Sequence, residues 1–557
     1  YEMSASLVGS EMCIRDRLQR TVADDAQHTL PNFRQGDAIV LYERNADTDN
    51  VTNKMVFKGN IDYLNENEIC IRLRATQQNS SVLPSDSLYA IEHDAMDTTF
   101  RSMYQGLYAF MSATKERRDL LLSQREPRFD AALDKQIAEA ADDFTRIALK
   151  AKAAKDYFLL VGPPGTGKTS CALKKMVETF YKEEGAQILL LSYTNRAVDE
   201  ICKALSSIRP EVDFIRVGSE LSCDENYREH LIENELATCM RRTEVYERIN
   251  RCRILVGTVA SISGKPELFR LKHFDVAIVD EATQILEPQL LGLLCARNVA
   301  GGNAIGKFIL IGDHKQLPAV VLQSESQSEV CEDCLHSIGL HNLKDSLFER
   351  LYRNSADTTH HLSLITNRSY DMLCRQGRMN VEVARFPNHA FYGGLLEPVG
   401  LQHQQGELTL APGLENDEFA DILVRRVVFL ASVPEVASQS AKINHFEAQL
   451  VARLAAAIYR QYDGTSGFRP ALTLGIITPY RSQIALIKSE IAALGIPCLN
   501  DILVDTVERF QGSERDVIIY SFCVNRTYQL KFLANLTEEG GVWTVSYTHL
   551  RAHETSA

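Results

Sequence analysis

The chain has one tryptophan among 557 residues, and it has no internal repeat, no low-complexity tract and no excess of positive charge. No apolar stretch approaches the ~20 residues of a membrane span, so no membrane partner is expected. The formal net charge of −13 excludes a general basic field, so any binding of nucleic acid must rest on a local groove. The 13 cysteines lack disulfide spacing, which is typical of a protein of the reducing cytoplasm.

The two ends of the chain are related to each other. A coding sequence for Ser4–Asp16 (SASLVGSEMCIRD) exists whose reverse complement encodes Val545–Ala557 (VSYTHLRAHETSA), and the single codon of methionine pairs Met12 with a histidine. No physical constraint makes two protein segments antisense images of each other. We therefore predict that residues 1–17 and 544–557 are translated adapter ends of a transposon-based sequencing library. The rest is then expected to be a gene fragment cut at both ends.

Hydrophobic periodicity divides the first part of the remaining sequence. Short alternating stretches with Asn, Asp and Gly turns (DAIVLYER, NKMVFKGNIDYL, EICIRLR and LYAIEH) predict a small β-barrel at residues 18–95. Apolar residues at three- and four-residue spacing then predict a helical stalk at 96–130. A second helical region is expected at 131–155.

Two later series of apolar strands alternate with helices. The first is DYFLLVG, QILLLSY, RILVGT, DVAIVDE and KFILIGD, and the second is RRVVFLAS, ALTLGIITPY, ILVDTV and DVIIYSFCV. Such βα alternation is typical of parallel sheets covered on both faces. We predict an α/β protein with two parallel-sheet domains, at 131–345 and 346–543. In the second, Asn444 with Glu447 predicts a helix start, and Gly464 its end.

The clearest motif is GPPGTGKT, which fits G-x-x-x-x-G-K-[ST] and stands between a predicted strand and a predicted helix. Its glycines let backbone N–H groups face a phosphate, and the helix N-terminus adds positive potential. Lys168 is placed to reach the β- and γ-phosphates, and the Thr169 hydroxyl to ligate Mg²⁺. The predicted nucleotide site comprises Gly162, Pro163, Pro164, Gly165, Thr166, Gly167, Lys168, Thr169 and Ser170.

Polar residues follow two further predicted strands, and ligands of open α/β sheets bind beyond the carboxyl ends of strands. In FDVAIVDEATQ, Asp280 is expected to hold Mg²⁺ through water, and Glu281 to orient and deprotonate the attacking water. In KFILIGDHKQLPAVV, Gln316 stands where an amide can contact the γ-phosphate and respond to its loss. Behind a phosphate loop, these groups predict hydrolysis of a nucleoside triphosphate.

Seven motifs in order resemble those of superfamily 1 helicases of the 5′-to-3′ branch: GPPGTGKT, LSYTNRAVDEI, VGTVAS, VDEATQ, GDHKQLPAVV, ITPYRSQ and DTVERFQGSERD. The chain is most similar to the helicase motors of replication nuclease-helicases and of RNA-decay helicases, roughly from Phe33 to Val542. The resemblance implies two RecA-like domains, ATP in the cleft between them, and a barrel with a helical stalk. It also implies single-stranded DNA or RNA across their tops, with DNA favoured.

The resemblance gives roles to further residues. Arg378 in CRQGRMN is expected to approach the γ-phosphate from the second domain and to stabilise transition-state charge. The family has an aromatic residue before this arginine where this chain has Gly377, so stacking on the base must come from elsewhere. Glu514 matches a residue that contacts the sugar of the nucleotide in the family. Gln136 matches a glutamine that recognises adenine.

Small hydroxyl and amide groups at predicted strand ends match residues with which the family contacts the nucleic-acid backbone. Such contacts do not depend on base sequence. Tyr480 adds a ring on which a base can stack. The predicted strand-binding set is Thr194, Asn195, Thr258, Pro479, Tyr480 and Thr506.

The resemblance breaks off at the C-terminal end. The family closes with an arginine-bearing helix, reading like N-V-A-L-T-R-A, shortly after the strand that contains FCV. Here the predicted adapter follows instead. The second domain is therefore expected to be truncated, and the chain to bind ATP but to hydrolyse it poorly.

The stretch CEDCLHSIGLH brings Cys331, Cys334, His336 and His341 together, but without a second CxxC an ordinary loop is favoured over a zinc site. Two alternatives to a helicase stay open. One is an ATP-dependent clamp or remodeller that grips nucleic acid without unwinding it. The other is a P-loop ATPase switch that does not act on nucleic acid.

Overall fold

The structure, a computed structural model, describes residues 2–7, 15–20 and most of 33–529. The predicted adapter at 544–557 and the place expected for the last helicase motif lie outside the described residues. Within the long range the residues left out are 34–35, 47, 65–67, 74–82, 85–86, 95–97, 320, 322, 324, 358–367, 436–439, 466, 511–512 and 527.

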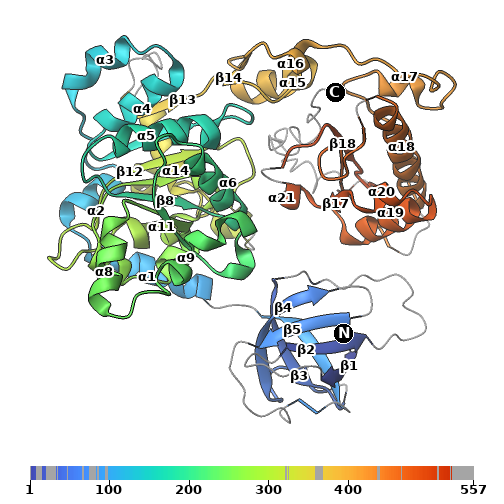
Figure 1. Cartoon of the computed structure of the whole chain (residues 1–557), viewed down its shortest axis with the longest axis horizontal. Helices are drawn as coiled ribbons and strands as arrows, with labels where there is room; N and C mark the ends of the chain where they lie inside the picture. Colours follow the sequence, from blue (N-terminus) through green and yellow to red (C-terminus); the bar gives the residue numbers. More distant parts are fainter. Residues whose placement is uncertain are drawn as a thin grey trace.

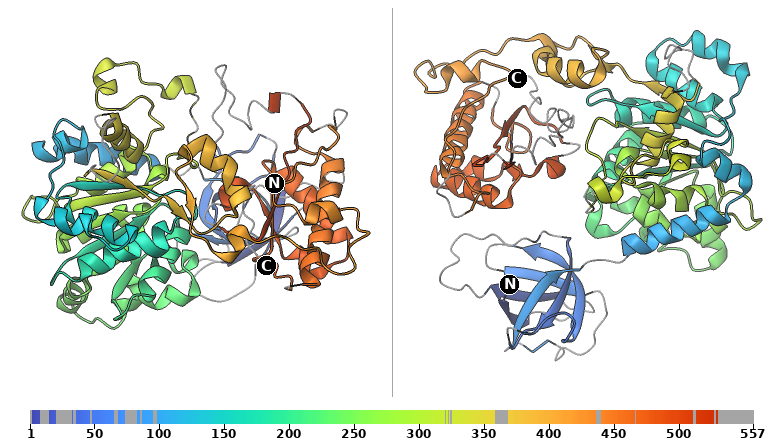
Figure 2. Two further views of the ribbon diagram at one scale, coloured as in Figure 1. Left: turned by 90° about the horizontal axis from the view of Figure 1, so that it is seen from above. Right: turned by 180° about the vertical axis from the view of Figure 1, so that it is seen from behind.

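An N-terminal barrel forms the first of three bodies, and in Figures 1 and 2 it stands apart from the two α/β domains. The barrel is closed and every strand pair in it is antiparallel. Inward-facing side chains of alternate residues, such as Ile39, Leu41, Ile69 and Ile71, fill its interior. In barrel order the strands are β1 (Glu2–Leu7), β2 (Arg15–Arg20), β5 (Glu68–Leu73), β4 (Val56–Leu64), β3 (Ala38–Glu43) and β6 (Leu88–His93).

The barrel predicted at 18–95 is confirmed as a fold, but it begins earlier than predicted. Strand β1 and the start of β2 lie in residues 1–17. The adapter origin of that segment stays a prediction.

The stalk consists of two helices, α1 (Thr98–Ser112) and α2 (Lys115–Leu121), separated where Thr114 caps α2 by accepting a hydrogen bond from Arg117 N. Helix α1 packs closely on α11 (Glu287–Leu294) of the first α/β domain. A Cβ atom on Gly106 would lie 2.0 Å from the carbonyl oxygen of Pro288, so the approach requires glycine at this position.

The first α/β domain is built on a seven-stranded, fully parallel sheet of order β13-β7-β12-β11-β8-β10-β9. The five strands predicted for it are confirmed, and β9 and β13 were not predicted. Because β13 pairs with β7, the domain extends to Met372, beyond the predicted boundary at 345. The strands are β7 (Tyr157–Val161), β8 (Ile188–Ser192), β9 (Phe214–Val217), β10 (Ile254–Thr258), β11 (Phe274–Val279), β12 (Ile305–Gly312) and β13 (Tyr370–Met372).

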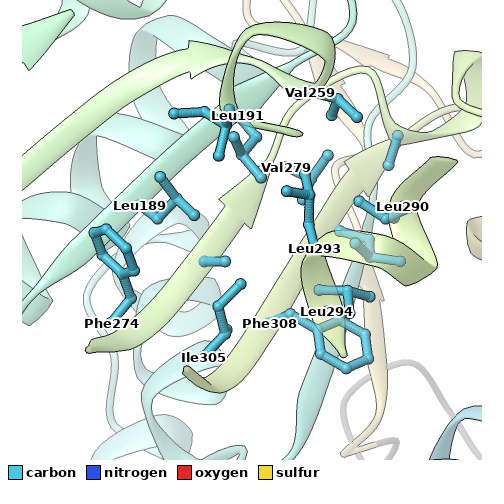
Figure 3. Packing of buried hydrophobic residues seen from close by; sticks show 14 of the residues in the cluster. Leu189, Leu191, Val259, Phe274, Val279, Leu290, Leu293, Leu294, Ile305 and Phe308 are labelled. Carbon is cyan, nitrogen blue, oxygen red and sulfur yellow. The ribbon is translucent and has the colours of Figure 1, made fainter. Parts of the chain in front are cut away.

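Both faces of this sheet are buried. Leu189 and Leu191 of β8 point into one apolar cluster with Val279 of β11, and Figure 3 shows them in the same cluster as the leucines of α11. Ile188 and Leu190 of the same strand point into the opposite cluster. Successive side chains of each strand therefore point into two different cores. Both sets must be apolar, which explains the nearly continuous apolar runs in the sequence.

Helices cover both faces of the sheet (Figure 1). The longer ones are α4 (Asp143–Ala153), α5 (Lys174–Tyr181), which follows a π-helical turn at Lys168–Leu173, α6 (Asn195–Ser206), α8 (Arg242–Arg251) and α14 (Leu347–Asp357). The short ones are α3 (Asp134–Ala138), α7 (Ile232–Glu235), α9 (Val259–Ser263), α10 (Leu268–Leu271), α12 (Glu325–Ser328) and α13 (Asp333–His336).

Residues 374–406, named here the bridge, arch from the first sheet toward the second (Figures 1 and 2). The bridge contains β14 (Arg375–Gln376) and β15 (Glu397–Pro398), which pair in parallel, α15 (Val381–Tyr392) and α16 (Gln402–Gln405).

The second α/β domain has a three-stranded parallel sheet of order β17-β16-β18. The strand predicted at RRVVFLAS is wrong, because residues 425–432 form no strand. A strand pairs with a neighbouring strand through backbone hydrogen bonds. Residues 425–432 do not form such a pair with β18, which pairs with β16 alone among the described residues. The elements are α17 (Ala420–Leu423), α18 (His445–Asp463), β16 (Leu474–Ile477), α19 (Arg481–Ala493), α20 (Pro497–Asn500), β17 (Leu503–Asp505), α21 (Val507–Phe510) and β18 (Val517–Tyr520).

Helix α18 begins and ends as predicted. The Asn444 side chain accepts a hydrogen bond from Glu447 N at 2.8 Å, and Gly464 is the C-cap. The return bond of a capping box is not made, since Asn444 N donates to Gln483. Among the described residues, no helix has both the length and the apolar character needed to cross a bilayer.

Candidate functional site

The phosphate loop connects β7 to the helix that begins at Lys168, as predicted. Gly162 N donates to Gly312 O at 2.9 Å, which ties the loop to the end of β12. The Thr166 hydroxyl donates to Pro163 O at 2.6 Å and closes the loop on itself. The Lys168 ammonium donates to Gly162 O at 2.5 Å, so the side chain lies over the loop whose phosphate it is expected to bind.

Thr169 and Asp280 meet at the base of the loop. The Thr169 hydroxyl donates to Asp280 Oδ2 at 2.5 Å, and Asp280 Oδ1 accepts from Glu281 N at 2.9 Å. Asp280 is 1% exposed, and its burial raises the pKa of its carboxyl group. A hydroxyl and a carboxylate are the hard oxygen donors that Mg²⁺ prefers, so the pair fits the predicted metal.

Glu281 stands next to this pair in a left-handed backbone conformation, with φ of 54°. Its Oε2 atom is buried and accepts no hydrogen bond from any residue that the structure describes. Burial, and then the charge of Asp280, raise the pKa of Glu281 to about 7. A carboxylate that gains and loses a proton near neutral pH has the property needed of a general base.

Gln316 is held by Asp313, a residue that the sequence analysis missed. The Gln316 side-chain amide donates to Asp313 Oδ2 at 2.8 Å, and Lys315 N donates to Oδ1 at 3.0 Å. Asp313 is 2% exposed. Burial lowers the pKa of Lys168, and Asp313 and Asp280 oppose that shift, so these charges lie within reach of each other. Asp313 directly follows β12, and a polar residue at the carboxyl end of a strand is a signal from which it could have been predicted.

The backbone around Arg378 lies against the phosphate loop. Gly377 N donates to Gly165 O at 2.9 Å. A Cβ atom on Gly165 would lie 2.4 Å from Arg378 Cβ, and the φ of Gly165 is 73°, so both space and conformation require glycine there. The charge of Arg378 contributes to lowering the pKa of Lys168. The structure therefore brings Arg378 close to the phosphate loop and to Lys168.

Two further contacts reach residues of the second domain. The Arg378 guanidinium forms an ion pair with the carboxylate of Glu514, the residue expected to contact a sugar. The Arg196 guanidinium, from the first domain, donates to the Ser513 hydroxyl of the second at 2.6 Å. Arg196 was not predicted, although it directly follows Asn195 in the motif LSYTNRAVDEI.

Gln136 lies exposed on α3, and no described contact connects it to the phosphate loop. The aromatic side chain of Phe144, on the first turn of α4, does lie there: its Cζ atom is 3.6 Å from where a Cβ atom of Gly167 would be. The adenine contact of Gln136 stays a prediction.

The predicted strand-binding residues all lie where a strand passes into a helix, at the carboxyl ends of β8, β10, β16 and β17. Two of them already have a structural task. Thr194 caps α6 by accepting from Ala197 N at 3.1 Å, and Thr258 caps α9 by accepting from Ser261 N at 3.0 Å. The Tyr480 hydroxyl accepts from Gln529 at 3.0 Å. Asn195 starts α6, Pro479 precedes the N-cap of α19, and Thr506 precedes α21.

In the part of the chain that the structure describes, no three His, Cys, Asp or Glu residues form a group suited to a metal ion. His336 and His341 stack with ring centroids 4.7 Å apart, and His336 Nε2 lies 2.5 Å from Val330 O. Both Cys331 and Cys334 are exposed. That this stretch is an ordinary loop stays a prediction.

The fold and the site define a P-loop protein with two parallel-sheet domains, in which the bridge contacts the loop. Family models described as AAA domain match this architecture, one over residues 134–247 and 236–324 and another over 343–538. The chain is thus similar to superfamily 1 helicases, and in particular to the replication nuclease-helicases.

The relatives carry a common name. The chain is 27% identical over 570 residues to the DNA replication ATP-dependent helicase/nuclease DNA2 of Bos taurus, covering 94% of this chain and 48% of that protein. The protein of that name from Homo sapiens is 28% identical over 484 residues, covering 80% and 41%. The one from Saccharomyces cerevisiae is 28% identical over 447 residues, covering 76% and 26%. The chain thus spans less than half the length of these relatives.

Proposed function

We propose that this chain is the ATP-driven motor of a helicase that moves along single-stranded DNA. The observation that carries the proposal is the contact of Gly377 N with Gly165 O, because it sets Arg378 of the bridge beside the phosphate loop of the first domain. A motor needs groups from two lobes at one triphosphate, so that binding and hydrolysis change the lobes' separation. DNA rather than RNA is supported by the printed names of the relatives.

In the proposed reaction, Lys168 binds the β- and γ-phosphates and Glu281 takes a proton from the attacking water. Thr169 and Asp280 would hold Mg²⁺, which when bound neutralises charge on the β- and γ-oxygens. Arg378 leaves Glu514 and stabilises the charge that develops on the transferred phosphoryl group. The 5′-to-3′ polarity and the strand contacts of Thr194, Asn195, Thr258, Pro479, Tyr480 and Thr506 belong to the proposal.

Location in a reducing compartment such as the cytoplasm also belongs to the proposal. It is supported by the 12 cysteines that the structure describes, all of which are free thiols.

Arg378→Ala in the full-length protein tests the proposal. We expect the strand-stimulated kcat to fall about 10³-fold, with a change of about threefold or less in the Kd for ATP. Arg385→Ala, an exposed arginine on α15, is the matched control and should change neither quantity. Unchanged kcat in Arg378→Ala would reject the two-lobe motor.

Strand displacement is measured beside hydrolysis. DNA-stimulated hydrolysis with displacement of an annealed strand supports a helicase, whereas stimulated hydrolysis without displacement indicates a clamp. Hydrolysis that no nucleic acid stimulates indicates a switch that acts on another partner.

A further inference from the structure

The bridge is fastened to the first domain near both ends of α15. Before the start of α15, Gly377 contacts Gly165 of the phosphate loop. At the end of α15, the Tyr392 hydroxyl donates to Asp313 Oδ2 at 2.6 Å, a contact between residues 79 positions apart in the chain. No sequence motif predicted the second contact.

The Tyr392 contact is enclosed on both sides. Tyr392 is 5% exposed and packs against Leu396 and Met372, while Asp313 is 2% exposed. Burial and the charge of Asp313 raise the pKa of Tyr392, so its hydroxyl remains a proton donor at neutral pH. Hydrogen bonds from a hydroxyl to a carboxylate are among the stronger ones in proteins. The contact therefore ties the end of α15 firmly to Asp313.

One oxygen of Asp313 serves two donors. Oδ2 accepts from the Tyr392 hydroxyl and also from the Gln316 amide, at 2.8 Å. Gln316 is the group expected to contact the γ-phosphate. If its amide turns to the γ-phosphate, it must leave Asp313, and the hydrogen bonding of Tyr392 changes with it. Occupation of the γ-phosphate site is thus linked to the bridge by two hydrogen bonds.

We propose that Tyr392 is a positioning residue, which transmits the presence of a γ-phosphate from Gln316 through Asp313 to α15, and so to the bridge that carries Arg378. The inference rests on the proposed function, because it requires a nucleoside triphosphate at the phosphate loop. Tyr392 acts through Asp313 and not on the nucleotide itself.

Hydrogen–deuterium exchange on this chain tests the proposal. The probes are AMP-PNP with Mg²⁺, which carries a γ-phosphoryl group, and ADP with Mg²⁺, which does not. We expect AMP-PNP to change the exchange of the α15 amides more than ADP does. In Tyr392→Phe that difference should fall to roughly a third or less, while the Kd for AMP-PNP stays within about twofold.

Tyr246→Phe is the matched control. It removes the same hydroxyl from an exposed tyrosine of α8 in the first domain, and it should leave the α15 response intact. Melting temperature is recorded for each variant, because a merely structural role of Tyr392 would lower stability without removing the difference between the two nucleotides.

The results separate two kinds of failure. An equal response of α15 to AMP-PNP in Tyr392→Phe and in the unaltered chain, or a response to ADP as large as that to AMP-PNP, overturns the role of Tyr392 alone. Absence of AMP-PNP binding to the unaltered chain overturns the proposed function with it. Should Tyr392→Phe not fold, Gln316→Ala leaves the packing of α15 intact and must also abolish the difference between AMP-PNP and ADP.

Discussion

The first domain has a sheet of seven strands and the second a sheet of three, and the first domain and the bridge bring different groups to the phosphate loop. On the first domain's side, Asp280 and Asp313 are almost fully buried and already hydrogen-bonded to neighbouring groups of the site. Beyond the first domain, Arg378 of the bridge is 24% exposed, and its partner Glu514 in the second domain is 53% exposed. In the proposed function, the first domain therefore presents a preorganised phosphate site, whereas the charge that completes it comes from a segment that must release an ion pair.

The largest expected effect tests the preorganised side. Glu281→Gln in the full-length protein should lower kcat about 10³-fold, with the Kd for ATP within about twofold, because the base is lost and the phosphate contacts remain. A rapid-quench assay measures the rate. Glu267→Gln, an exposed carboxylate of the same domain, is the control. A loss of ATP affinity as large as the loss of rate would contradict the assignment.

The pH profile sharpens that result. The raised pKa of Glu281, about 7, means that the base is protonated and idle below this pH and ionised above it. The kcat/KM for ATP should therefore rise with pH through about 7 and then level off, since kcat/KM reports groups of the free enzyme. The small residual rate of Glu281→Gln should lack this rise, and a shared rise would assign it to another group.

Lys168→Ala tests binding on the same side. Loss of a charged donor to two phosphates should weaken the Kd for Mg–ATP about 100-fold in this chain, measured by titration with a fluorescent ATP analogue. Lys182→Ala, at the far end of the helix that follows the loop, is the matched control. Equal affinity in both variants would place the nucleotide elsewhere.

A smaller effect probes the second side of the cleft. Glu514→Gln removes the partner that holds Arg378, and exposed ion pairs contribute little, so kcat in the full-length protein should rise by about fivefold or less. Steady-state hydrolysis with saturating DNA measures it. A fall of about 100-fold would instead show that Glu514 acts directly on the nucleotide.

The smallest effect concerns the strand-end loops. Thr194→Ala removes the cap of α6 and should cost about 1 kcal/mol of stability, seen as a lower melting temperature. If Thr194 also contacts DNA, the Kd for a labelled oligothymidine should rise about threefold. Thr194→Ser keeps the hydroxyl and should preserve both properties. Lower stability with unchanged DNA affinity would show that Thr194 caps α6 but does not contact DNA.

The parts of the fold that were predicted correctly are those whose signal lies within a few consecutive residues of the sequence. The apolar runs at β7, β8, β10, β11 and β12 and the capped helix α18 each carry their own signal. The strand predicted at 425–432 is wrong because a short apolar run indicates burial, and burial alone does not require a strand. Strand β13 was missed because three residues carry too little periodicity.

What the sequence by itself determined is the phosphate site. Lys168 and Thr169 are fixed to it by one loop and the start of one helix, and Asp280 with Glu281 by the strand that ends at Val279. Only the tertiary structure decided that Arg378 lies beside Gly165, that Arg196 reaches Ser513 and that Tyr392 binds Asp313. Those contacts join residues far apart in the chain, and they depend on how the bridge and the two domains pack on one another, which no local pattern of residues encodes.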